Sequence, residues 1–131
     1  MSEYSTDKDL AWSMLERYLQ TLGFDDVSAF RGDVIELEAS GNKQLIFEVL
    51  ERGLLISVIK EVAAYQLAEV VKPAMAMCHY REFLPVPICV GMGKNDQLAF
   101  SCLLSIGGDF LEVINPAVDI LLSLHDKLDI A

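Results

Sequence analysis

Three short apolar segments between residues 34 and 59 constrain the fold more than any other feature of this sequence. Residues 34–38, 45–49 and 54–59 each show the alternation, or the run of apolar side chains, that is typical of a β-strand. Turn-forming residues separate these segments at 40–42 and at 52–53. Because the connections are short, the three strands are predicted to pair consecutively in an antiparallel meander.

Apolar residues recur with the spacing of a helix on both sides of this meander. A first helix is predicted at about 8–22, a second from Tyr65 to about Tyr80, and a third over 109–128. Pro73 falls inside the second segment and Pro116 inside the third. A proline within a helix kinks or breaks it, so each of these segments is either one kinked helix or two helices.

Two further strands are predicted at residues 88–92 and 98–106, joined by a hairpin loop. The element order is therefore α-β-β-β-α-β-β-α, and the fold class is α+β with an antiparallel five-stranded sheet and three helices. A length of 131 residues suits one domain, so residues 1–131 are expected to fold as a single unit. If the three helices lie on one side of the sheet, its other face is bare unless something else covers it.

The charge balance narrows the classes of partner. Ten basic and twenty acidic residues leave a net charge of −10, which repels phosphate groups, so we expect no nucleic-acid partner and no membrane-surface binding. Three cysteines without C-x-x-C spacing argue against a disulfide framework. The polar N-terminus is unlike a signal peptide, and no apolar run reaches the roughly 18 residues of a membrane span. These features predict a cytoplasmic protein.

No group of residues predicts a catalytic or metal site. Cys78-His79 is the one adjacent pair of good metal ligands, whereas zinc needs three or four ligands at defined spacing. A nucleophile at Ser101 or Cys102 would lack any local sequence signature. We therefore expect no metal, no cofactor and no enzymatic activity, and a binding role instead.

Apolar side chains are also predicted on the sheet face opposite Phe47. By strand alternation this face carries Ile46, Leu50, Leu55 and Ile59. These side chains form either an exposed patch for dimerisation or protein binding, or one side of a fully covered core. The sequence leaves both interpretations open.

The element order and two segments carry a resemblance to a known family. Residues 15–23, Leu-Glu-Arg-Tyr-Leu-Gln-Thr-Leu-Gly, are similar to the family's first helix ending in a glycine. Residues 95–104, Asn-Asp-Gln-Leu-Ala-Phe-Ser-Cys-Leu-Leu, are similar to its final hairpin, which an amphipathic closing helix follows. The chain thereby resembles the class I type III secretion chaperones of Gram-negative bacteria. The related YbjN-like bacterial domain fits the same segments.

The chaperone resemblance implies a homodimer joined through the second helix and an effector protein, the client, bound as an extended segment without ATP. A YbjN-like domain would instead be a regulatory or adaptor domain that binds a folded partner, and a small enzyme is the remaining alternative. The candidate client-contact residues are Trp12, Leu19, Ile35, Ile46, Leu50, Leu55 and Ile59. The candidate dimer residues are Val71, Ala74, Met75 and Cys78.

Overall fold

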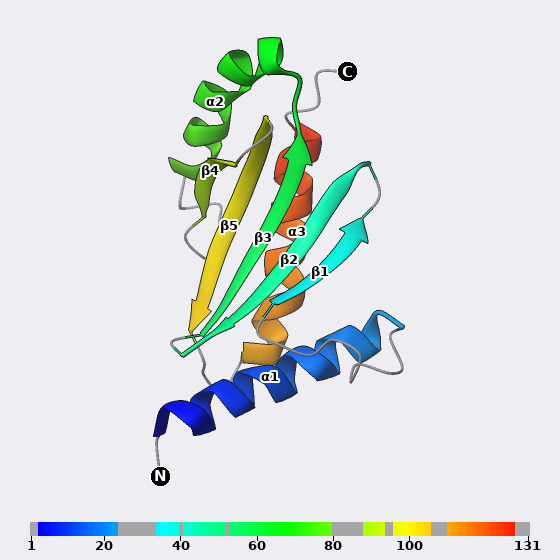
Figure 1. The fold of residues 1–131 in the computed structure, drawn as a ribbon, viewed down its shortest axis with the longest axis vertical. Helices are drawn as coiled ribbons and strands as arrows, with labels where there is room; N and C mark the ends of the chain where they lie inside the picture. Colours follow the sequence, from blue (N-terminus) through cyan, green and yellow to red (C-terminus); the bar gives the residue numbers. More distant parts are fainter. Residues whose placement is uncertain are drawn as a thin grey trace.

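The computed structural model describes residues 3–23, 34–39, 41–51, 53–79, 88–93, 96–105 and 110–127. Figure 1 shows a sheet with helices packed behind it, below it and beside its upper end. The elements, in chain order, are α1 (Glu3–Thr21), β1 (Val34–Ala39), β2 (Lys43–Leu50), β3 (Gly53–Glu61), α2 (Ala64–His79), β4 (Cys89–Gly93), β5 (Gln97–Ser105) and α3 (Phe110–Lys127). The predicted α+β class and the α-β-β-β-α-β-β-α order are confirmed.

The five strands form one antiparallel sheet in the order β1-β2-β3-β5-β4. The meander β1-β2-β3 is therefore as predicted, and β5 pairs with β3 so that β4 becomes the second edge. Gly41 and Asn42, between β1 and β2, both have positive φ angles of 78° and 61°. Glycine adopts positive φ angles without steric cost and asparagine tolerates them better than most residues, which is why a Gly-Asn pair suits this turn.

One face of the sheet, here named the inner face, forms the core. Register places Ile35 opposite Phe47, Phe47 opposite Ile56, and Ile56 opposite Cys102, and all four side chains are buried. The neighbouring row of Leu45, Val58 and Phe100 is buried as well. Because strand side chains alternate in direction, the residues between these rows point to the other face, here named the outer face.

Helices α1 and α3 cover the inner face. Figure 1 shows α3 running behind the strands and α1 crossing below their lower end. Leu15 of α1 and Leu121 of α3 are fully buried, and Tyr18 of α1 meets the ring of Phe47 edge to face at 5.9 Å between centroids. These contacts join both helices and the sheet in one core.

Helix α2 packs against the edge strand β4, where Val70 and Ala74 are buried. Figure 1 shows it beside the upper end of the sheet. Two helices therefore share the inner face rather than three, because α1 and α3 already fill it and the apolar stripe of α2 is left to cover the sheet edge.

Helices α2 and α3 each continue through their internal proline, so neither segment is divided into two helices. Because Pro73 has no N–H, the carbonyl of Glu69, four residues earlier, loses its helical hydrogen bond. Both residues are on the exposed side of α2, where water can donate to that carbonyl. Helix α1 begins at Glu3 rather than near residue 8, since the polar residues ahead of the apolar stripe contain no glycine or proline. The predicted ends at residues 80, 106, 109 and 128 lie outside the described residues.

Candidate functional site

The outer face carries a group of apolar side chains that lies apart from the core. Pairing puts Leu55 beside Leu103 and Ile59 beside Ala99, while β2 contributes the other two members. These six side chains are here named the outer band: Ile46, Leu50, Leu55, Ile59, Ala99 and Leu103. All are partly or largely exposed, with Leu103 at 46%, and none belongs to the core cluster of the described residues.

The middle of the outer band is polar but uncharged. Ser57 and Ser101 face each other between the Leu55 and Ile59 rows, and their Oγ atoms are 2.8 Å apart in a hydrogen bond. One hydroxyl donates to the other in this bond, so each takes part in a hydrogen bond within the sheet. Covering the pair with an apolar side chain would therefore cost less than covering two hydroxyls without any partner, each of which costs about 1–3 kcal/mol.

The charged side chains on the outer face of the described strands are all acidic. Glu36 and Glu38 belong to β1, Glu48 to β2 and Glu61 to β3. The strand lysines, Lys43 and Lys60, lie opposite each other in the register and point to the inner face. The outer face consequently combines an apolar band with a negative margin.

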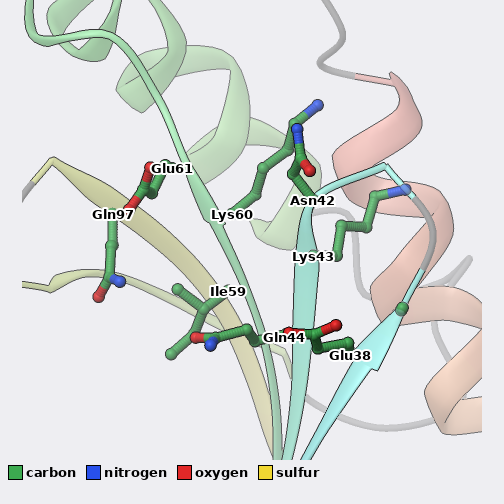
Figure 2. A pocket seen from close by; sticks show the side chains of 9 residues that line it. Glu38, Asn42, Lys43, Gln44, Ile59, Lys60, Glu61 and Gln97 are labelled. Carbon is green, nitrogen blue, oxygen red and sulfur yellow. The ribbon is translucent and has the colours of Figure 1, made fainter.

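A polar hollow of about 460 Å³ lies at the end of the outer band, next to Ile59. In Figure 2, Ile59, Gln44 and Glu38 lie in one row, as the register requires, and Glu61 lies beside Gln97. Lys43 extends from this hollow toward α3, where its Nζ atom is 2.5 Å from a carboxylate oxygen of Asp126. The lining holds no histidine, cysteine, serine or threonine, and it offers amides and charged groups for binding.

A second, more open hollow of about 740 Å³ lies where the end of α1 meets α3, lined by Arg17, Tyr18, Gln20, Thr21, Leu22 and Asn115. Burial raises the pKa of the Tyr18 phenol, and the negative charge of Asp119 raises it further. Tyr18 is therefore a neutral hydrogen-bonding group at physiological pH rather than a base.

The structure brings four of the candidate client-contact residues together: Ile46, Leu50, Leu55 and Ile59 lie on the outer face. Trp12, on α1, is half-buried against the core cluster. Leu19 is fully buried and Ile35 is 2% exposed, so these two belong to the core of the protomer. In β1, Glu36 and Glu38 point outward together with Val34, whereas Ile35 points inward, so the expected client contact at Ile35 is wrong.

The candidate dimer residues lie on α2, but they differ in exposure. Met75 is 57% exposed and Val71 is half-buried, whereas Ala74 is fully buried against the protomer. The side chain of Cys78 lies outside what the structure describes. Tyr65 of α2 and Met92 of β4, exposed by 80% and 61%, were not among the candidates. Tyr65 stands nine residues before the buried Ala74, which puts it on the opposite side of the helix. This spacing is the sequence signal that could have identified Tyr65 as exposed.

Neither a metal centre nor a membrane span is found in the part of the chain that the structure describes. No three histidine, cysteine or acidic side chains come together there in a way that could hold a metal ion. None of the described helices is long and apolar enough to cross a lipid bilayer.

Comparison with known proteins yields similar folds. No protein-family model matches the chain, and no curated protein matches its sequence. A chain of the heterodimeric complex ExoU–SpcU, from the type III secretion system of Pseudomonas aeruginosa, matches with a TM-score of 0.62 and 18% identity, over 86% of this chain and 92% of that one. YbjN from E. coli, a suggested transcription regulator, matches with a TM-score of 0.59 and 16% identity, over 89% and 87% of the two chains. At these identities the likeness establishes the fold.

Proposed function

We propose that this protein is an ATP-independent secretion chaperone, which holds an extended segment of an effector protein on the outer face of its sheet and acts as a homodimer. The observation that carries the proposal is the outer band, an apolar surface that the described helices leave uncovered. Such a surface on a small acidic domain is typical of a site for another protein chain. The fold shared with a chain of the ExoU–SpcU complex supports the same reading.

The outer band suits an unfolded client better than a small molecule. Its members are spread over β2, β3 and β5 on one sheet face, with the hydrogen-bonded Ser57–Ser101 pair among them, whereas small-molecule sites are concave and enclose their ligand. Holding a chain in an extended form costs ordering entropy, which a large apolar contact area offsets. We infer that the client lies along the strands and buries Leu55, Ile59 and Leu103.

The homodimer in this proposal is formed through α2 and the neighbouring strand β4. Tyr65, Met75 and Met92 are large apolar side chains that stay exposed in the protomer and belong to these two elements. A second copy that covers them would remove apolar surface from water, which stabilises the dimer by about 25 cal/mol per Å² of apolar surface buried. The dimer surface would then lie apart from the outer band, so that client binding and dimerisation are separable.

A regulatory or adaptor role on a folded partner is the second candidate, since the likeness to YbjN is nearly as close as that to the secretion-complex chain. The two functions differ in the state of the bound partner. A chaperone keeps its client segment accessible to protease and export-competent, whereas an adaptor binds a partner that is already folded.

Co-expression tests this proposal. The protein is produced together with N-terminal segments of the proteins encoded next to its gene, and each segment is examined for recovery in the complex, protease sensitivity and independence of ATP. We expect one such segment to be recovered in an extended, protease-sensitive form. Recovery of folded partners alone would overturn the chaperone role in favour of the adaptor role.

Two variants serve as reciprocal controls in this experiment. Leu55→Asp should abolish recovery of the client while light scattering still reports a dimer. Met75→Asp should yield a monomer by light scattering because it charges the exposed face of α2. A wild-type protein that is monomeric at micromolar concentration would contradict the homodimer.

A further inference from the structure

The carboxylates of the outer face lie mostly on one side of it, formed by β1 and β2 and here named the acidic half. Glu36, Glu38 and Glu48 stand on these strands beside the outward apolar side chains Val34, Ile46 and Leu50. Strands β3 and β5 carry Leu55, Ile59, Ala99 and Leu103, and their one outward charge, Glu61, lies at the end of β3. Any segment that lies along the strands would therefore meet carboxylates together with apolar side chains on one side, and mainly uncharged side chains on the other.

Within the described strands, the carboxylates of the acidic half have no basic neighbour on their own face. Glu36 and Glu38 are successive outward residues of β1, about 7 Å apart, and Glu48 is the diagonal neighbour of Glu36 across the β1–β2 pair. Like charges at these separations repel each other. Since Lys43 and Lys60 point inward, the repulsion is not offset by a cation of the described strands. A cation from another molecule would relieve it.

We propose that the segment bound on the outer face is a basic amphipathic one, whose apolar side chains cover the outer band and whose lysine or arginine side chains pair with Glu36, Glu38 and Glu48. This inference rests on the proposed function of the same face and names the chemistry of its partner. The two halves of the face lie parallel to the strands, so they also fix the orientation of the segment. Its cationic side lies over β1 and β2.

The test uses two fluorescein-labelled peptides of equal length, one alternating leucine and lysine and the other leucine and glutamate. Fluorescence anisotropy reports their dissociation constants for the full-length protein. We expect the lysine peptide to bind and the glutamate peptide to bind at least tenfold more weakly. Equal binding of the two peptides would overturn the proposal.

A matched pair of triple variants separates this site from the general attraction of an acidic protein for cations. Glu36→Gln, Glu38→Gln and Glu48→Gln together remove three charges from the outer face. Glu16→Gln, Glu69→Gln and Glu112→Gln remove three charges from the helices, which gives the same net charge. The first triple should weaken binding of the lysine peptide about tenfold, because it removes three exposed ion pairs, whereas the second should leave it within about twofold.

An equal loss in both triples would overturn the proposal, because it would mean that net charge alone attracts the peptide. The same triples, tested on a client recovered by co-expression, separate the basic character of the bound segment from the holding function itself. A client that is lost in Leu55→Asp but retained in the outer-face triple would refute a basic segment and leave the holding function intact. Glutamine is close in size to glutamate, and thermal unfolding monitored by circular dichroism verifies that both triples are folded.

Discussion

His125 of α3 places its Nε2 atom 2.7 Å from the carbonyl oxygen of Val58, in the middle of strand β3. The imidazole is 2% exposed and meets the ring of Phe100 edge to face, with 4.8 Å between centroids. Since a carbonyl oxygen accepts, Nε2 donates this hydrogen bond. The contact anchors the C-terminal part of α3 to the centre of the sheet.

Burial lowers the pKa of His125 below its ordinary value of 6.5, and the positive charges of Lys43 and Lys60 lower it further, against the opposing effects of Val58 and Asp126. The unfolded chain therefore binds a proton at a higher pH than the folded protein does. The stability that comes from this histidine is fully present above about pH 6.5 and declines as the pH falls below it, by at most about 1.4 kcal/mol per pH unit.

The change that tests this is His125→Gln, because an amide NH₂ can still donate to the Val58 carbonyl and does not titrate. Urea unfolding between pH 5 and pH 7 should show a smaller loss of the free energy of unfolding on acidification in the variant than in the wild type. Parallel pH profiles would rule out a contribution from His125.

The ion pair between Lys43 and Asp126 gives a second prediction. The hydrogen bond from Lys43 lowers the pKa of the Asp126 carboxyl below its ordinary value of 3.8. The stabilisation is therefore present above that value and is lost as the pH falls through the lowered pKa. Lys43→Met should bring the pKa of Asp126 back toward 3.8, as measured by NMR titration of the side-chain carboxyl. An unchanged titration curve would mean that the pair does not form in solution.

Gly53 stands where the start of β3 passes the backbone of β5, so tightly that a Cβ atom would lie 2.0 Å from the carbonyl oxygen of Leu104. Gly53→Ala should therefore lower the free energy of unfolding by about 1–3 kcal/mol, because the strands must shift. Gly91→Ala is the matched control, since a Cβ atom there meets nothing within 4 Å. Similar midpoints of urea unfolding for the two variants would contradict this close approach.

The two described cysteine side chains should differ in reactivity. Cys89 is exposed on the edge strand β4, whereas Cys102 is buried and burial raises its pKa to about 11. In a Cys78→Ser background, which leaves these two thiols, a thiol reagent at pH 8 should modify Cys89 quickly and Cys102 only after denaturant is added. Fast modification of both thiols in the native protein would show that β5 opens.

The spacing at which apolar side chains recur along the chain indicates helix or strand, so the helices and strands could be predicted from the sequence. The β1–β2–β3 meander needed only local alternation and the Gly41-Asn42 turn. Alternation also placed Ile46, Leu50, Leu55 and Ile59 together on one face. The same reasoning misplaced Ile35, because apolar and acidic residues alternate in β1 and alternation alone does not tell which of the two sets faces the helices.

Which face the helices cover, and what stays uncovered, was decided by packing between distant parts of the chain. The inner face accommodates α1 and α3, which places α2 at the edge, and none of these three described helices lies over the outer band. The buried position of His125 and the pairing of Lys43 with Asp126, 83 residues apart, likewise depend on that packing. A local pattern records which side chains share a face, whereas only the folded chain decides which of those faces water can reach.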